Sequence, residues 1–212
     1  YSHLCHSNDI MIMGVPGIAH DVEKIKNQNP GYNKLILYQL EPLSKHHWWP
    51  IDYLIDHIKN MNPDEVWDYD LDNIEILKSY GIDAHYRPFL YTQSLKRVKN
   101  KENLDIDVLF YGTLTPHRSK ILESLVIDNL IGRNIIYSFG MFSDQLDEFI
   151  GRSKIILDIH SLDVQEEQYQ KQTRIFYALI NDKCVVSQKS KRNFFLFCAV
   201  YKKLKYEVIY NV

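Results

Sequence analysis

The stretch spanning residues 107–125 constrains the fold of this chain more than any other part of it. An apolar run over residues 108–111 stops at Gly112, and a short polar loop with the cations Arg118 and Lys120 follows. Beyond the loop, three apolar residues recur at helical spacing: Ile121, Leu122 and Leu125. The pattern predicts a strand, a glycine turn and a helix whose first turn carries cations. Such a turn offers backbone N–H groups and positive side chains to an anion, most often a phosphate.

Short apolar runs alternate with amphipathic segments along the chain, which predicts an α/β fold with parallel sheets and right-handed crossovers. The expected strands are residues 34–38, 65–69, 84–88, 108–111, 134–138, 154–159, 184–187 and 206–210. The expected helices are residues 51–61, 72–80, 118–130, 143–152, 166–180 and 194–204. The predicted architecture is two Rossmann-like, doubly wound domains that face a cleft, with ligands beyond the carboxyl ends of the strands.

The polar, basic segment 94–103 lacks sustained periodicity and divides the chain into predicted domains at residues 1–95 and 104–212. Two interpretations fit it, a linker or a solvated helix end. Residues 1–32 are short for the first strand and helix of a Rossmann-like domain. Two interpretations are therefore open. Residues 10–17 are a remnant of that strand and helix in a shortened domain, or the true beginning of the domain is absent.

Composition excludes several classes of protein. The net charge of −2 over 212 residues disfavours a general nucleic-acid binder, which needs excess Lys and Arg. Three cysteines without framework spacing favour a reducing compartment, and no run is long and apolar enough to span a bilayer. The expected location is the cytoplasm, or the host cytoplasm if the chain is viral. Because Tyr1 replaces an initiator Met and no signal peptide is evident, a processed product or a piece of a longer polypeptide with further domains is expected.

Several segments resemble GT-B glycosyltransferases of the bacterial and viral type that use nucleotide sugars. Residues 109–118 (Leu-Phe-Tyr-Gly-Thr-Leu-x-x-x-Arg) resemble the opening strand and loop of a GT-B donor domain. Residues 153–160 and 172–188 resemble a later strand and a following helix and strand of that domain, and residues 37–41 and 66–69 resemble parts of the acceptor domain. The resemblance implies that residues 1–95 bind a glycan or other hydroxyl acceptor and that residues 104–212 bind a nucleotide-sugar donor.

The resemblance also implies an activity: hexosyl or deoxyhexosyl transfer without a metal or other cofactor, the diphosphate being stabilised by cations and a helix N-terminus. The chain departs from the family pattern at Gln188, where a Glu often binds the donor ribose. Gln can hydrogen-bond a hydroxyl but carries no charge.

Candidate site residues follow from the three requirements of glycosyl transfer: a stabilised leaving group, a held nucleoside and an aimed acceptor hydroxyl. The candidate catalytic residues are Glu41, Arg118 and His160. The candidate substrate-binding residues are Gly112, Thr113, Lys120, Ser138, Gly140, Arg174, Gln188 and Lys189, with Tyr137 and Ser190 near the nucleoside. Replacing Arg118 with alanine is expected to abolish transfer and leave the fold intact.

Each candidate has a structural alternative. Arg118 is either a phosphate ligand or a solvated cation, His160 either a ligand or a satisfied loop histidine, and Arg174 either a ligand or an ion-pair partner of Asp158. In the first half, Trp48 and Trp49 suit either sugar stacking or packing. An inverting enzyme also needs a general base, for which Glu41, Asp68 and His46 are the candidates.

Other chemistries have weaker support. His3, Cys5, His6 and His20 lack the spacing of a zinc motif, so no metal site is expected. No Rossmann Gly-x-Gly-x-x-Gly, P-loop or nucleophile-elbow motif occurs. The alternative function is a non-catalytic module, cut from a larger polypeptide, that binds a nucleotide or a glycan. A response-regulator or flavodoxin-like pair would need an acidic phospho-acceptor pocket or a flavin loop, and neither is evident.

Overall fold

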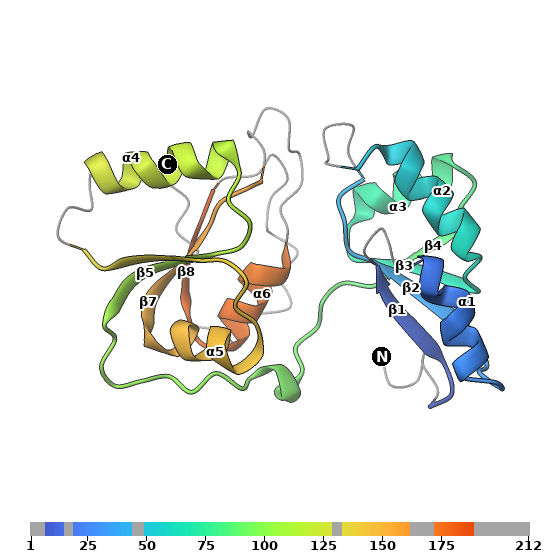
Figure 1. Cartoon of the computed structure of the whole chain (residues 1–212), viewed down its shortest axis with the longest axis horizontal. Helices are drawn as coiled ribbons and strands as arrows, with labels where there is room; N and C mark the ends of the chain where they lie inside the picture. Colours follow the sequence, from blue (N-terminus) through green and yellow to red (C-terminus); the bar gives the residue numbers. More distant parts are fainter. Residues whose placement is uncertain (1–6, 15–18, 44–48, 129–132, 162–171, 189–212) are drawn as a thin grey trace. The chain divides into compact units, whose positions relative to one another are not determined.

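The structure, a computed structural model, describes residues 7–14, 19–43, 49–128, 133–161 and 172–188. The chain forms two compact units, Tyr1–Phe89 and Leu90–Val212, each built on its own parallel sheet of four strands (Figure 1). The α/β class predicted from the sequence is therefore correct. The expected helix 194–204 and strand 206–210 lie outside the described residues.

The first unit is a parallel sheet whose strands follow one another in sequence order. Its strands are β1 (Ile10–Gly14), β2 (Leu35–Gln39), β3 (Glu65–Asp68) and β4 (Ala84–Tyr86), in the order β1-β2-β3-β4. Its helices are α1 (Ala19–Gln28), α2 (Ile51–Met61) and α3 (Leu71–Ser79). Because every right-handed crossover advances in the same direction, the three helices belong on one face of the sheet. Residues 10–17, for which the sequence left open a remnant of the first strand and helix or an absent beginning, start with the strand β1. Helix α1, which follows, was not predicted.

The core of the first unit lies between this sheet and its helices. Its buried residues are Ile12, Val22, Leu35, Leu37, Leu43, Leu54, Ile55, Ile58, Met61, Val66 and Leu77. The spacing of Leu54, Ile55 and Ile58 gives α2 the apolar stripe that this packing requires. The opposite face of the sheet carries a separate, largely aromatic cluster of Ile36, Tyr38, Trp67 and Tyr69.

The second unit is doubly wound. Its strands are β5 (Ile106–Tyr111), β6 (Ile135–Ser138), β7 (Ser153–Asp158) and β8 (Cys184–Ser187), and its helices are α4 (Pro116–Asp128), α5 (Ser143–Arg152) and α6 (Gln172–Ile180). In the order β6-β5-β7-β8, the chain places β6 on one side of β5 and then crosses back to place β7 and β8 on the other side. Because of this reversal helices cover both faces of the sheet, α4 on one and α5 and α6 on the other (Figure 1). The doubly wound topology predicted for both halves is present here, whereas the described part of the first unit runs in one direction only.

The polar segment 94–103 is neither a free linker nor a helix end. After a short 3-10 turn (η1, Gln93–Leu95), it is hydrogen-bonded along the second unit through Asn181, which is 1% exposed. Asn181 Oδ1 accepts the N–H groups of Arg97 and Val98, both at 2.9 Å, and Nδ2 donates to the carbonyl of Leu95 at 3.0 Å. The Arg97 side chain also pairs with Asp147 at 2.8 Å. Residues 95–100 therefore belong structurally to the second unit.

Candidate functional site

The candidate site lies where the second sheet reverses its winding, at the carboxyl ends of β5 and β7. Doubly wound sheets bind ligands at such switch points. Gly112 follows β5 directly, with a φ of +134°, and its N–H donates to the carbonyl of Ser138 at the end of β6, at 3.0 Å. The ends of β5 and β6, and the loops that follow them, therefore meet at this edge of the sheet.

The loop after Gly112 leads into α4 through a capped helix N-terminus. Thr115 is buried, and its hydroxyl accepts the N–H of Arg118 at 3.2 Å while donating to the carbonyl of Ser161 at 2.8 Å. Pro116 occupies the first helical position, where its missing N–H costs nothing. The strand, turn and helix predicted from residues 107–125 are confirmed, and the cap also ties α4 to the loop after β7.

Arg118 is buried, in contrast to a solvated first-turn cation. Its side chain is 5% exposed, Nε donates to the carbonyls of Ile159 and His160 at 3.0 and 3.2 Å, and Nη1 donates to the carbonyl of Thr113 at 2.7 Å. The guanidinium lies 5.4 Å from the ring centroid of Phe110. Arg118 therefore joins the loop after β5 to the loop after β7. Removing Arg118 would leave three backbone carbonyls without this donor, so the structure leads us to expect a loss of stability in Arg118→Ala where the sequence led us to expect an intact fold.

Arg174, on α6, forms the ion pair with Asp158 that the sequence offered as its structural alternative. Nη1 donates to Asp158 Oδ1 at 2.5 Å, and the side chains are only 13% and 3% exposed. The Ser187 hydroxyl donates to the second carboxylate oxygen at 3.0 Å, so both oxygens of Asp158 are occupied. The guanidinium carbon lies 5.3 Å from the Phe110 ring and 5.2 Å from the Tyr111 ring.

Two polar atoms beside this ion pair are buried without a hydrogen-bond partner in the described structure, Arg174 Nε and the Tyr111 hydroxyl. Burial raises the pKa of the Tyr111 phenol, so it remains a neutral donor. Buried polar groups are nearly always hydrogen-bonded, and exceptions call for an explanation such as an absent ligand or water.

The two guanidinium groups converge on Gly112. A Cβ at this position would lie 2.7 Å from Arg174 Nη2 and 3.9 Å from Arg118 Nη1. Glycine is thus required both by the positive φ and by the approach of Arg174. The site brings together Gly112, Arg118 and Arg174, three of the residues predicted from the sequence.

Gln188 and His160 form a second, internal part of the site. The Gln188 N–H donates to the carbonyl of Asp158 at 2.9 Å, and its Oε1 accepts the N–H of His160 at 3.1 Å. The Gln188 amide also lies 3.2 Å from Nε2 of His117, in the first turn of α4. His160 is 3% exposed. Gln188 therefore connects β8, β7 and α4.

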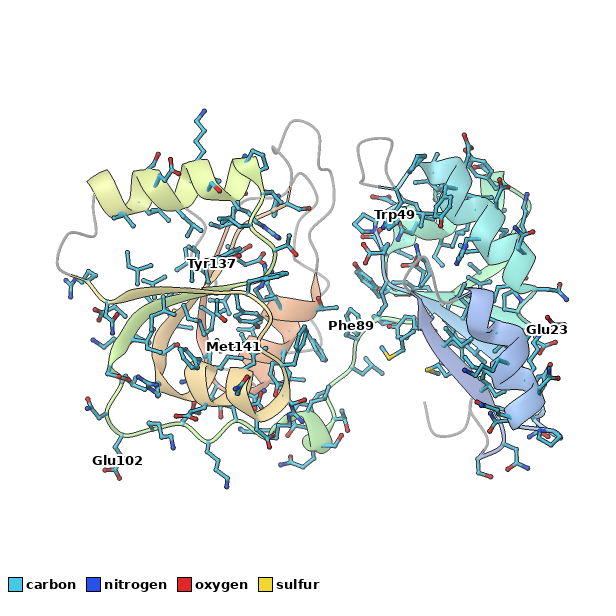
Figure 2. The ribbon with its side chains drawn as sticks, in the orientation of Figure 1. Glu23, Trp49, Phe89, Glu102, Tyr137 and Met141 are labelled. Carbon is cyan, nitrogen blue, oxygen red and sulfur yellow. The ribbon has the colours of Figure 1, made fainter. Side chains whose placement is uncertain are left out.

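An exposed aromatic loop follows β6, beside Gly112. Tyr137, labelled in Figure 2, is 41% exposed and stacks on Phe110, with ring centroids 5.7 Å apart. Phe139 and Phe142 are 68% and 76% exposed and flank Gly140, whose φ is +76°. Tyr137 and Gly140 were predicted from the sequence, whereas Phe139 and Phe142 were not, although the run Phe-Gly-Met-Phe after a strand was a visible signal.

The remaining predicted residues of this unit are less informative. Ser138 is buried and contributes its carbonyl to Gly112, whereas Thr113 and Lys120 are exposed. Lys189 and Ser190 lie outside the described residues.

In the first unit, the candidate base Asp68 is fully buried at the end of β3. Its oxygens accept the Asp70 N–H at 2.8 Å and the Asn73 side-chain N–H at 2.9 Å. Burial raises the pKa of this carboxyl to about 8. A side chain with 0% exposure cannot reach an acceptor hydroxyl, so Asp68 organises the loop instead.

The other candidates of the first unit lie near this loop or outside the described part. Glu41 is half-buried, and its carbonyl accepts the Asn73 amide at 3.1 Å. Trp49 is 40% exposed and stacks on Tyr53, 5.3 Å away. His46 and Trp48, like His3, Cys5 and His6, fall outside the described residues. Within the described ranges no group of three His, Cys, Asp or Glu residues is placed to hold a metal ion.

Comparisons with known proteins give no family assignment. No family model and no curated protein matches the chain. Among solved structures, the crystal structure of TarM matches with a TM-score of 0.48 and 13% identity over 99% of this chain and 47% of that chain. The crystal structure of a GtfA/B complex bound to UDP and GlcNAc matches with a TM-score of 0.34 and 13% identity over 85% and 42%. The chain thus spans less than half of either structure.

At TM-scores below 0.5, these likenesses establish neither a family nor an activity for this chain. In the part of the chain that the structure describes, no helix is long and apolar enough to cross a membrane.

Proposed function

We propose that this protein transfers a glycosyl group from a nucleotide-sugar donor to a hydroxyl acceptor, without a metal ion. The observation that carries the proposal is the convergence of Arg118 and Arg174 on Gly112, at the winding reversal of the second sheet. An anion at this edge would meet Arg174, the Tyr111 hydroxyl and the N-terminal end of α4. Such an arrangement suits the diphosphate that a nucleotide sugar releases.

The proposal assigns different roles to the two arginines. Among the described residues the Nε of Arg174, beside Tyr111, has no hydrogen-bond partner, so Arg174 is proposed to neutralise the leaving diphosphate. Nε and Nη1 of Arg118 donate hydrogen bonds to backbone carbonyls, so Arg118 is proposed as a positioning residue that fixes the loops after β5 and β7. The nucleoside is proposed to lie against Tyr137, near the end of β6, and the following loop with Gly140, and the ribose near Gln188.

The first unit is proposed to bind the acceptor, a glycan or another hydroxyl compound. Glu41 is the remaining candidate base of the described residues, because Asp68 is buried and His46 lies outside them. The transferred sugar is proposed to be a hexosyl or deoxyhexosyl group. Thr113, Lys120, His160 and Lys189 are proposed to complete the donor site.

Calorimetry with UDP, GDP and dTDP and with their sugars, beside a hydrolysis and transfer assay, tests the proposal. Arg174→Lys keeps the charge opposite Asp158 but loses the planar fork, so nucleotide affinity should fall by roughly 10- to 100-fold. Arg152→Lys is the matched control. Arg152 also pairs with a carboxylate, that of Asp105, but these two residues directly precede β7 and β5 and so lie at the amino ends of the strands, away from the candidate site.

Failure of all three nucleotides to bind, or equal losses in the two variants, would refute the donor site. Tight binding without hydrolysis or transfer would instead support the non-catalytic binding module. That alternative has one specific observation in its favour, since Gln188 offers no carboxylate and its amide already bonds within the protein.

A further inference from the structure

His117 lies in the first turn of α4, between two residues that fix this turn to the loop after β7. On one side the Thr115 hydroxyl donates to the carbonyl of Ser161 at 2.8 Å. On the other side Arg118 Nε donates to two further carbonyls of that loop, at 3.0 and 3.2 Å. The half-buried His117 is therefore held at the carboxyl edge of the second sheet, where the candidate site lies.

The orientation of the Gln188 side-chain amide follows from a backbone group. The His160 N–H, which can only donate, lies 3.1 Å from Oε1 of Gln188, so the amide oxygen is on that side. The amide nitrogen then lies 3.2 Å from Nε2 of His117, and in the part of the chain that the structure describes it has no other acceptor. Because an amide nitrogen can only donate, Nε2 of His117 accepts this hydrogen bond.

This contact decides where the ring proton of neutral His117 lies. A neutral imidazole has one donor and one acceptor nitrogen, and the hydrogen bond made by one nitrogen sets the state of the other. With Nε2 accepting from Gln188, the proton lies on Nδ1. Oε1 of Gln188 is also 3.2 Å from Nε2, but a proton on Nε2 would leave the amide nitrogen facing an N–H group.

His117 consequently offers two N–H groups that the described fold does not use. Neither its Nδ1 nor its backbone N–H has a hydrogen-bond partner among the described residues. Both belong to the first turn of α4, a helix of 13 residues. A first helical turn favours an anion over other ligands, because its N–H groups and the helix dipole both attract negative charge.

The same edge of the sheet holds the groups of the proposed donor site. The hydroxyl of Ser187, which precedes Gln188, bonds the carboxylate of Asp158 that pairs with Arg174. Arg174 Nε and the Tyr111 hydroxyl are buried without a hydrogen-bond partner in the described structure, which points to a ligand at this edge. His117 would approach that ligand from α4, whereas Arg174 would approach it from α6.

We propose that Gln188 holds His117 as the Nδ1–H tautomer and that His117 donates hydrogen bonds to the diphosphate of the bound nucleotide. The proposal rests on the proposed function, which supplies the nucleotide. His117 is then a ligand-binding residue, and Gln188 is a positioning residue that acts through it. A carboxylate at position 188 would accept a proton from Nε2 instead, and neutral His117 would then present an acceptor nitrogen to the phosphate oxygens.

The first test reads the tautomer in the free chain. Two-bond ¹H–¹⁵N correlation spectra at about pH 8, where an unperturbed imidazole is neutral, distinguish a protonated ring nitrogen from an unprotonated one. Wild-type His117 should carry its proton on Nδ1. In Gln188→Glu, which keeps an acceptor for the His160 N–H, Nε2 should be protonated instead. His85, which is exposed on β4, is the reference ring in both spectra.

The second test asks whether the Nδ1 donor contacts the diphosphate. The amide nitrogen of asparagine takes nearly the place of Nδ1 in histidine, and that of glutamine the place of Nε2. His117→Asn should therefore keep the affinity for UDP, GDP or dTDP, whichever binds the wild-type chain, within about threefold in calorimetry. His117→Gln should weaken it by about tenfold or more, the effect of one hydrogen bond to a charged group.

Two controls accompany the calorimetry. His85→Gln replaces an exposed histidine of the first unit and should leave nucleotide affinity unchanged. Inorganic pyrophosphate, which lacks the nucleoside, should show the same difference between the two His117 variants. A difference seen with the nucleotide but not with pyrophosphate would assign His117 to the nucleoside and overturn the proposed contact.

The outcomes separate this proposal from the proposed function. A proton on Nε2 of wild-type His117, or an unchanged tautomer in Gln188→Glu, would overturn the role of Gln188. Nucleotide binding with equal affinities for His117→Asn and His117→Gln would overturn the role of His117 and leave the proposed function intact. If none of the three nucleotides binds the wild-type chain, the proposed function fails and the ligand assigned to His117 fails with it, whereas the spectra still decide the tautomer.

Discussion

Replacing Gly112 with alanine should destabilise the second unit for two separable reasons. The first is conformational, because a φ of +134° lies in a region that residues with a Cβ rarely occupy. Holding such a residue there costs about 1–3 kcal/mol. Gly140 provides the comparison. Its φ is +76°, and a Cβ built on it meets nothing within 4 Å, so Gly140→Ala should cost only about 1–2 kcal/mol.

The second reason is crowding at the ion pair. The alanine Cβ would lie 2.7 Å from Arg174 Nη2, so the guanidinium must move. That movement disturbs its 2.5 Å bond to Asp158, in a pair whose side chains are 13% and 3% exposed. Weakening a charge-assisted hydrogen bond in such a place costs about 1–3 kcal/mol. The two effects together predict a loss of about 2–6 kcal/mol for Gly112→Ala.

Urea unfolding, followed by circular dichroism, measures these losses. The decisive comparison repeats Gly112→Ala in a background where Arg174→Met and Asp158→Asn remove the ion pair. Only the conformational cost should remain there, so the coupling energy should exceed about 1 kcal/mol. The reasoning would be refuted if Gly112→Ala and Gly140→Ala were equally costly, or if the loss were the same in both backgrounds.

Three further predictions concern other parts of the chain. Asp68 keeps its proton up to about pH 8 in the folded chain but releases it near its ordinary pKa of 3.8 when unfolded. The free energy of unfolding should therefore fall as the pH rises between these values, by up to about 1.4 kcal/mol per unit, and Asp68→Asn should flatten the slope in urea titrations across that window. Asn181→Ala strands the N–H groups of Arg97 and Val98 and should cost about 2–4 kcal/mol. In this variant the rate of hydrogen exchange at those two amides should rise much more than the rate at the amides of β5. An unchanged rate would count against the role of Asn181 in holding residues 95–100. Phe139→Ser with Phe142→Ser should change stability by less than about 0.5 kcal/mol, because both rings are mostly exposed. If the loop holds the nucleoside, the same double variant should weaken nucleotide binding by roughly tenfold or more in calorimetry, and unaltered affinity would exclude it.

Periodicity predicted the elements whose own residues bury a face. The helix at residues 51–61 was recognised because its apolar residues recur every three or four positions, and the strand at 108–111 because its run is apolar throughout. Helix α1 was missed, since Val22 and Ile25 are its only apolar residues after Ala19. Two apolar positions in one decapeptide do not distinguish a helix from a polar loop.

Long-range contacts explain the remaining differences. Segment 94–103 looks polar and aperiodic, and its partner Asn181 lies more than 80 residues away, so no local pattern could reveal it. For Arg118 the sequence showed a cation in a first helical turn. It could not show that the carbonyls of Ile159 and His160 lie within reach of that cation.

The strand orders of the two sheets also imply different folding kinetics. In the first unit every pair of neighbouring strands is joined by a single crossover, so contacts form between segments close in sequence. In the second unit β5 pairs with β7, which comes later than β6 in the chain, and residues 95–100 are hydrogen-bonded to Asn181, which comes later still. Domains rich in local contacts fold faster than those that depend on distant ones. During synthesis the first sheet can therefore form while the second unit is still emerging, and the second cannot close until Asn181 has left the ribosome.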